Sequence, residues 1–241
     1  MLATLLKDLK QNAEVLDYGC FGWSLHAQGT ALGRNDLKHS GSDIQRPEKI
    51  PAGVAFYEST EVDNSIGCDS DKFDLVVASH VFEHILKPIP LFAELARVCK
   101  PGGKIYIESP SDRSLYPLSS PDVCGHAFLN FWDDPTHVRP WTPAAFYRLA
   151  ISFGYMPVKC AYMTAPFAKI FYRFRRLYAL LKRDGDMLTD ITWEAYNWRC
   201  YVVIEKPVDV MGKPEYRFIS LKGISRGTEN ALKLYRDLIG H

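Results

Sequence analysis

The chain has 241 residues, a length typical of one large domain or two small ones, and its formal net charge of +1 argues against nucleic acid as a partner. Hydrophobic residues make up 47% and charged residues 24%, as in ordinary globular proteins and unlike disordered chains. No run of 18 apolar residues occurs and the first eleven residues do not resemble a signal peptide, so we expect neither a transmembrane helix nor secretion.

The first half of the chain alternates helix and strand patterns. Leucines at helical spacing predict an opening helix, and further helices are predicted at 24–32 and 88–99. The second of these should end at Pro101-Gly102-Gly103, where a glycine takes the left-handed cap. Strands are predicted at 14–18, 40–44, 54–57, 73–78 and 104–108. This alternation indicates an α/β fold with right-handed crossovers and a mostly parallel sheet.

The second half is less regular. Residues 110–141 are polar and rich in proline, which is typical of functional loops or disorder. Further predicted elements are a helix at 142–153, strands at 156–162 and 199–205, a helical insert at 166–183 and a final helix at 228–239. We interpret the chain as a single domain, 1–241, with insertions 110–141 and 163–198 that cap the substrate and a tail, 207–241.

A glycine-containing turn follows the first strand in the run Asp17-Tyr-Gly-Cys-Phe-Gly-Trp-Ser24. Glycine lets backbone N–H groups approach a ligand, and the next helix adds positive potential at its N-terminus. Asp43, at the end of the next strand, could hold a ribose hydroxyl. The structural alternatives are a helix-capping Asp17 and a turn carboxylate at Asp43.

Four segments in this order resemble motifs of the class I S-adenosylmethionine-dependent methyltransferases: Val15–Cys20, Phe73–His84, Glu94–Gly103 and Asp134–Pro143. The last of them, Asp-Pro-Thr-His-Val-Arg-Pro-Trp-Thr-Pro, resembles a segment of a small-molecule branch. The resemblance covers residues 14–160. It implies a Rossmann-like three-layer sandwich with about seven strands, the last of them antiparallel, S-adenosylmethionine as methyl donor and S-adenosylhomocysteine as product.

The resemblance also implies a set of donor-binding residues. Asp17 would face the methionine amino group, Asp43 the ribose, and either Glu61 or Asp63 the adenine. The whole predicted set is Asp17, Gly19, Cys20, Phe21, Gly22, Asp43, Ile44, Glu61, Asp63, Ser79 and His80.

The donor loop departs from the family pattern at Phe21, which stands where a second glycine is usual and cannot easily take a positive φ. Either the loop is rebuilt around Gly22, or donor binding is weakened. The alternative function is therefore a non-catalytic relative with a degenerate donor loop. A nicotinamide dehydrogenase is a further alternative, but Gly-x-Gly-x-x-Gly is absent and Glu83-His84 is present.

Three histidines are candidate bases for an oxygen acceptor: His80, His84 and His137. The unperturbed pKa of histidine, ~6.5, suits removal of a hydroxyl proton near neutral pH. The structural alternatives are a buried, backbone-bonded His84 and a His137 that merely bonds Asp134. Predicted substrate-binding residues are His126, Arg139, Trp141 and Arg173. No defined ligand pattern predicts a metal site.

The insert 167–183 is amphipathic and basic. Its apolar stripe comprises Ile170, Phe174, Leu177, Tyr178 and Leu181, and Arg173, Arg176, Lys182 and Arg183 lie off the stripe. We interpret it as a helix packed on the sheet with solvated cations. The alternatives are a lid, a site for an anionic substrate, and a helix lying on a membrane surface.

The resemblance, together with the basic insert, implies O-methylation of a small molecule, either a saccharide or a phosphorylated or nucleotide-linked acceptor that a basic lid would suit. The six cysteines are far apart and form no Cys-x-x-Cys pair, which favours free thiols in a reducing cytoplasm. The sequence leaves the oligomeric state open.

Overall fold

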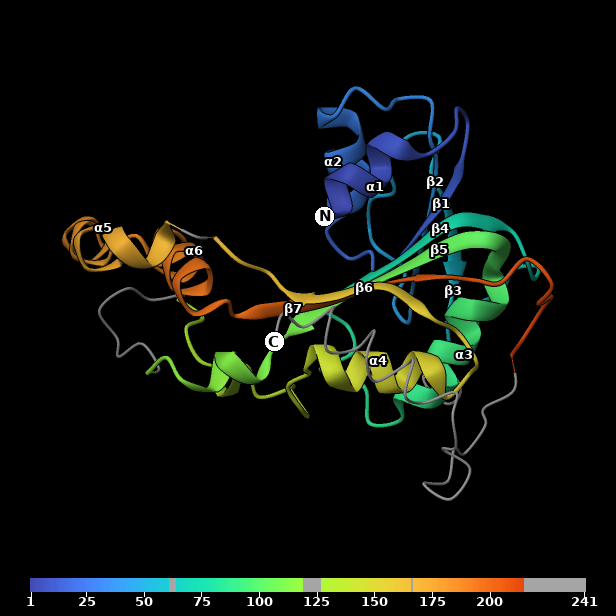
Figure 1. Cartoon of the computed structure of the whole chain (residues 1–241). Coiled ribbons are helices and arrows are strands. Elements are labelled where there is room, and N and C mark those ends of the chain that lie inside the picture. The colour runs from blue at the N-terminus through green and yellow to red at the C-terminus, as the bar shows by residue number, and fades with distance from the viewer. Residues whose placement is uncertain (61–63, 119–126, 166, 215–241) are drawn as a thin grey trace, which may run out of the picture.

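A seven-stranded sheet forms the centre of the computed structural model, which describes residues 1–60, 64–118, 127–165 and 167–214 (Figure 1). The strand order is β3-β2-β1-β4-β5-β7-β6. β7 is antiparallel to both of its neighbours and every other pair is parallel, so the predicted Rossmann-like sheet with an antiparallel last strand is confirmed. The strands are β1 (Glu14–Tyr18), β2 (Lys38–Asp43), β3 (Ala55–Glu58), β4 (Phe73–Ser79), β5 (Cys99–Pro110), β6 (Pro157–Tyr162) and β7 (Arg199–Glu205).

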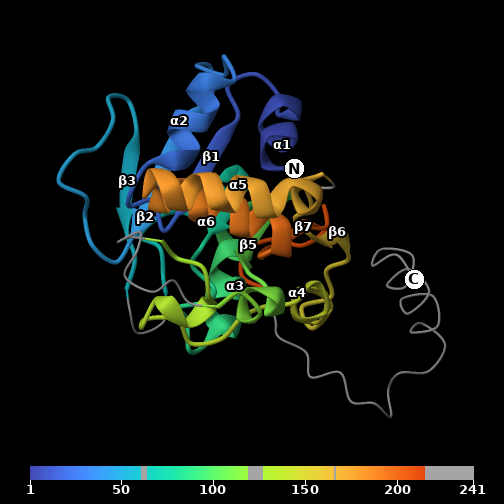
Figure 2. The ribbon, with the colours of Figure 1, turned by 90° about the vertical axis from the view of Figure 1, so that its left-hand side faces the viewer.

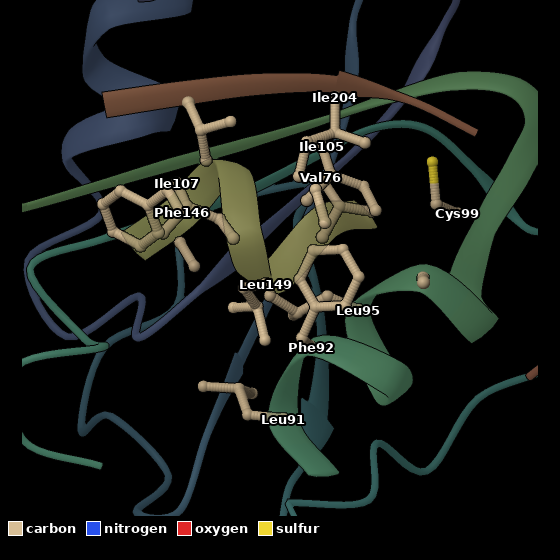
Figure 3. Close-up of a cluster of buried hydrophobic side chains, with 14 of the residues drawn as sticks. Val76, Leu91, Phe92, Leu95, Cys99, Ile105, Ile107, Phe146, Leu149 and Ile204 are labelled. Carbon is tan, nitrogen blue, oxygen red and sulfur yellow. The ribbon is translucent and has the colours of Figure 1, made fainter. Parts of the chain in front are cut away.

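Helices cover both faces of this sheet, and the apolar pattern of the chain explains why. On one face lie α1 (Leu2–Asp8) and α2 (Ser24–Ala31), and on the other lie α3 (Pro88–Val98) and α4 (Pro143–Ile151). β4 is buried almost throughout because it is central and covered on both sides. Figure 3 shows the hydrophobic core on the second of these faces, where side chains of α3 and α4 such as Phe92 and Leu149 pack on Val76 and Ile105 of the sheet.

The end of α3 differs from the prediction. α3 ends at Val98, and Cys99 is already extended as the first residue of β5, so the predicted glycine cap was wrong. The Pro101-Gly102-Gly103 segment lies inside β5 instead. Phe73 pairs with Cys99 and Leu75 pairs with Lys104, so the intervening residues of β5 form a bulge. Gly102 takes the positive φ of 72° that this bulge requires.

Two helices project from the sheet between β6 and β7: α5 (Ala168–Lys182), which was predicted, and α6 (Gly185–Tyr196), which was not (Figure 1). α5 does not pack on the sheet, so that interpretation was wrong. It packs on α6, and Ala179 of α5 belongs to a small core with Leu188 and Ile191 of α6. The predicted apolar stripe of α5 is exposed.

Residues 110–141 contain two short 3-10 turns, η1 (Asp112–Leu115) and η2 (Phe131–Asp133), in the part of this segment that the structure describes. The predicted tail helix at 228–239 lies outside the described residues. Across the described part of the chain, no helix has the length and hydropathy needed to cross a membrane.

Candidate active site

The loop after β1 forms the floor of the first cavity. Gly19 has a φ of 82° and its N–H donates to the Ser42 carbonyl at 2.8 Å. A Cβ at Gly19 would lie 2.5 Å from a methyl group of Val81, so only glycine lets the loop lie this close to the segment after β4. This closeness brings β1, β2 and β4 together at their carboxyl ends, where ligands bind in open α/β sheets.

Phe21 stands where the family usually has a second glycine, and the positive φ of this part of the loop is found at Trp23; Gly22, around which one of the two alternatives rebuilt the loop, has none. Trp23 takes the left-handed conformation, with a φ of 52°, directly before α2. Its indole N–H donates to the Lys49 carbonyl at 2.8 Å, and a Cβ at Gly41 would lie 2.5 Å from its ring. The ring is therefore held against β2, away from the loop. Phe21 is left 78% exposed at the rim.

The first cavity, of about 400 Å³, lies over the carboxyl ends of β1 and β2. Five residues predicted to bind the donor line it: Gly19, Phe21, Asp43, Ile44 and His80. We call it the donor cavity.

The other predicted donor residues lie elsewhere. Asp17 and Ser79 line a neighbouring cavity of about 350 Å³ together with Glu108 and Arg199. The predicted residues that line neither cavity are the buried Cys20 and the exposed Gly22. Glu61 and Asp63 lie outside the described residues.

Asn64 also lines the donor cavity and was not predicted. It accepts a hydrogen bond from the Tyr18 hydroxyl at 3.4 Å and has a left-handed φ of 56°. The sequence reasoning considered only the acidic residues of this loop, although a side-chain amide can both donate to and accept from an adenine ring.

Asp17 is held at the junction of β1 and α2. Burial raises the pKa of its carboxyl to about 7, against the hydrogen bond that the carboxylate accepts from the Leu25 N–H and with a further contribution from the nearby charge of Asp43. The hydrogen bond shows that Asp17 organises the start of α2. A cationic group bound beside Asp17 would stabilise the carboxylate and lower this pKa.

His80 lies between the donor cavity and a second cavity, and it has a left-handed φ of 56°. Its Nδ1 lies 3.2 Å from a Glu83 carboxylate oxygen, and its Nε2 lies 3.7 Å from one of Glu108. Burial lowers its pKa, but the hydrogen bonds and charges of Glu108 and Glu83 outweigh burial and raise that pKa to about 9. At neutral pH His80 is therefore an imidazolium with no free lone pair, which disfavours the predicted role as a base.

This assignment predicts an alkaline titration. The His80 ring stacks on Trp193 at 5.7 Å, so loss of its proton should change the tryptophan fluorescence with a midpoint near pH 9. Because the folded pKa is raised, the ion pairs stabilise the fold fully below the unfolded pKa of ~6.5, and this stabilisation is lost as the pH rises through about 9. The titration should be absent from His80→Asn. A midpoint near 6.5 in the wild-type protein would contradict it.

The second cavity has a volume of about 510 Å³ and lies under α6. We call it the acceptor cavity. His80 and His84 line both cavities, so the two meet at these histidines. The remaining lining residues are Glu83, Phe128, Asn130, Asp134, His137, Asp186, Thr189, Asp190, Trp193 and Trp198.

All three candidate bases line this cavity, and hydrogen bonds fix which ring nitrogen carries the proton in two of them, His84 and His137. The Thr136 hydroxyl donates to Asp134 at 2.6 Å, so it accepts from Nδ1 of His84 at 2.9 Å and leaves Nε2 of His84 as the basic nitrogen. In His137, Nδ1 donates to the Phe131 carbonyl at 2.6 Å, and Nε2 lies 3.8 Å from a carboxylate oxygen of Asp134, so the contact with Asp134 that was the structural alternative for this residue is present. The two rings lie 4.8 Å apart. Both imidazoles are thus held in one tautomer.

A ligand atom from each of Glu83, His84 and His137 lies within 4.8 Å of the other two, so the group also has the donor set of a transition-metal site. However, Glu83 is already engaged by the His80 imidazolium and by the Ser109 hydroxyl at 2.8 Å. The Glu83 carboxylate therefore already has two partners within the protein.

Of the four residues predicted to bind the substrate, none that the structure describes lines the acceptor cavity. Arg139 donates to the Ile85 carbonyl at 3.1 Å, and Trp141 is buried and donates to the Phe82 carbonyl at 3.1 Å. Both therefore hold the segment that follows β4. Arg173 lies on α5, in a separate cleft. His126 lies outside the described residues.

Four lining residues come from α6, which the sequence did not predict to be a helix. Asp186, Thr189, Asp190 and Trp193 follow one another at helical spacing and so share a face. Trp193 stacks on Trp198 at 4.3 Å with an interplanar angle of 10°. This spacing is the signal that could have identified the wall of the cavity.

A family model described as "Methyltransferase domain" matches residues 1–159 of the chain. The ubiquinone biosynthesis O-methyltransferase of Hahella chejuensis is 27% identical over 100 residues, which are 39% of this chain and 42% of that protein. The protein of the same name from Chelativorans sp. is 26% identical over 140 residues, 54% of each chain. The chain thus spans about half the length of these relatives.

Solved structures share the fold at low identity. A SAM-dependent methyltransferase from Archaeoglobus fulgidus has a TM-score of 0.58 at 21% identity and covers 85% of this chain and 91% of its own. A phosphoethanolamine N-methyltransferase from Haemonchus contortus, solved with S-adenosyl-L-methionine, has a TM-score of 0.57 at 16% identity. The match covers 86% of this chain and 51% of that protein.

Proposed function

The chain belongs to the class I S-adenosylmethionine-dependent methyltransferase family, and we propose that it transfers a methyl group from S-adenosylmethionine to a hydroxyl oxygen of a small, uncharged, saccharide-like acceptor. One observation carries this proposal: the donor cavity and the acceptor cavity meet at His80 and His84. A methyl group that leaves one cavity would enter the other beside the free nitrogen of His84.

The residues of the donor cavity fit this donor. The Asp43 carboxylate can accept hydrogen bonds from the two ribose hydroxyls, and Ile44 offers an apolar face to the adenine ring. When bound, the donor supplies a methyl group made electrophilic by its sulfonium. The chain's task is then to hold the two reactants in line and to exclude water.

His84 is the base in this proposal. Its Nε2 accepts the proton of the acceptor hydroxyl while the oxygen forms its bond to the methyl carbon. The imidazolium that results is stabilised because its Nδ1–H already donates to Thr136, which donates to Asp134. His137, with its ring 4.8 Å away and its Nε2 3.8 Å from an Asp134 oxygen, helps to place the acceptor beside His84.

The lining of the acceptor cavity supports an uncharged polyhydroxy acceptor. Asp134, Asp186 and Asp190 can accept hydrogen bonds from hydroxyl groups, and Trp193 offers a flat apolar surface to a sugar ring. Among the described lining residues His80 is the one with a cationic side chain, and Glu83 and Glu108 already pair with it. The lining therefore does not favour a phosphorylated or nucleotide-linked acceptor.

The test is methyl transfer from labelled S-adenosylmethionine to a panel of sugars, sugar phosphates and catechols. We expect transfer to sugars, with a KM raised by about tenfold or more in Asp190→Asn because a charged hydrogen bond contributes ~1.5–3 kcal/mol. Asp209→Asn, an exposed aspartate far from this cavity in sequence, is the matched control. Preferred transfer to sugar phosphates or catechols would overturn the acceptor assignment but not the transfer reaction.

A further inference from the structure

One side of α5 and of Phe167, which precedes it, carries large exposed apolar side chains. Their exposed fractions run from 52% for Tyr178 to 76% for Phe174 and Leu181. We call this face the α5 surface; its residues are Phe167, Ile170, Phe171, Phe174, Leu177, Tyr178 and Leu181.

The spacing of these residues turns them all to one side. At 100° per residue they fall within an arc of roughly 120° on the helix. The buried residues Ala168 and Ala179, through which α5 packs on the rest of the molecule, lie close to the opposite side. The α5 surface thus points away from the fold. In Figure 2, α5 is the helix nearest the viewer, in front of α6.

Cations border this apolar surface. Lys169 and Arg173 lie along one flank and Lys182 along the other, and all three are exposed. The chain has no acidic residue between 167 and 183. Arg175 forms an ion pair with Glu194 at 2.6 Å, so it takes part in holding α5 on α6. The pattern of apolar face and cationic flanks is typical of helices that lie in a membrane interface.

Two clefts open on the basic flank. One, of about 540 Å³, is lined by Arg173 and Arg176 with Tyr172 and Tyr196. The other, of about 440 Å³, is lined by Lys169 with Arg113 of η1. Each places two cations beside tyrosine rings, and the first is also lined by Leu177 of the α5 surface. This is the arrangement that would receive the phosphate of a lipid whose acyl chains contact the α5 surface.

We propose that the α5 surface docks on an anionic phospholipid bilayer. Its apolar residues would enter the boundary between head groups and acyl chains, and its cations would contact the head-group phosphates. A second copy of the chain fits less well. Two α5 surfaces placed face to face would bring their cationic flanks together with no acidic residue of either helix between them.

The test is co-sedimentation of the full chain with vesicles of phosphatidylcholine, either pure or mixed with about 30% of the anionic lipid phosphatidylglycerol. We expect binding that needs the anionic lipid and weakens in high salt. The double variant Phe174→Ser/Leu181→Ser should bind about tenfold or more weakly, since both side chains are exposed in the free protein and would lose their contact with lipid.

Two further variants separate the contribution of the flanking cations from that of the apolar side chains of the α5 surface. Arg173→Glu/Lys182→Glu should lose the preference for anionic lipid. Val208→Ser/Met211→Ser, which removes two other exposed apolar side chains, should bind as the wild type does. Unchanged melting temperatures would show that each variant folds.

Equal binding of the Phe174/Leu181 variant and the wild type would overturn the proposal. So would a wild-type protein that ignores vesicles but dimerises through the α5 surface, as shown by its mass in solution before and after these substitutions. Neither measurement depends on methyl transfer, so this inference and the proposed reaction can fail separately.

Discussion

Replacing His84 with alanine should lower kcat by about 10²- to 10⁴-fold, the usual contribution of a positioned general base. His84 is the histidine that lines both cavities and also keeps a free nitrogen, because its other nitrogen donates to Thr136. The KM for S-adenosylmethionine should change little, since the charged partner for the donor is Asp43. The measurement is steady-state methyl transfer, with His26→Ala as a histidine control on α2, outside both cavities.

A second variant separates the base from a merely structural histidine. Thr136→Val removes the hydroxyl that accepts from Nδ1 and connects His84 to Asp134. The imidazolium that forms in the reaction then loses its partner, so kcat should fall while the KM for S-adenosylmethionine stays close to that of the wild type. An unchanged kcat in Thr136→Val, or an active His84→Ala beside an inactive His137→Ala, would assign the proton transfer to His137 instead.

Replacing Asp43 with alanine should weaken binding of S-adenosylhomocysteine by about 10- to 100-fold, since hydrogen bonds to a charged group contribute ~1.5–3 kcal/mol. Asp43 ends β2, beside the Gly19 loop. Within the described residues, its carboxylate accepts a long hydrogen bond of 3.4 Å from the Gln45 N–H, so it keeps acceptor capacity for a ligand. Its removal should leave the fold intact.

Asp43→Asn is the matched control for this prediction. It keeps the shape and one acceptor oxygen, so its affinity for S-adenosylhomocysteine should fall between those of the wild type and Asp43→Ala. Isothermal titration calorimetry measures all three. Equal affinities would mean that the ribose does not lie at the end of β2.

The sheet could be predicted from the sequence because its strands have local signatures. β4 reads as a continuous apolar run, and β7 was predicted with the bounds that the structure shows. The end of α3 could not be predicted in this way. Pro101-Gly102-Gly103 reads equally well as a helix cap, and only the pairing of Cys99 with Phe73 makes it part of a strand.

The donor cavity was predictable in outline, whereas the wall of the acceptor cavity was not. Gly19, Asp43 and Ile44 follow strands in the order of a known family, so their convergence followed from the topology. α6 has no such motif. Asp186 and Asp190 make its sequence look polar, although the opposite side of the helix is apolar, so no helix was predicted there. Because α6 was not foreseen, α5 was wrongly placed against the sheet.

The change at Phe21 shows a limit of motif reasoning about a single position. A missing glycine suggested either a loop rebuilt around Gly22 or a weakened donor site. In the structure Trp23 takes the left-handed conformation and its ring is held by Lys49 and Gly41. Such a conformation costs about 1–3 kcal/mol in a residue other than glycine, and the contacts of the indole offset it.

The most direct test of a working donor cavity is the melting temperature of the wild-type chain with and without S-adenosylhomocysteine, with NAD as the control ligand. A ligand at ~100 times its Kd adds about 2.7 kcal/mol, which for a chain of this size corresponds to a rise of roughly 5–11 °C. We predict a rise of this size with S-adenosylhomocysteine and none with NAD. No rise at millimolar S-adenosylhomocysteine would contradict the donor site and, with it, the proposed methyl transfer.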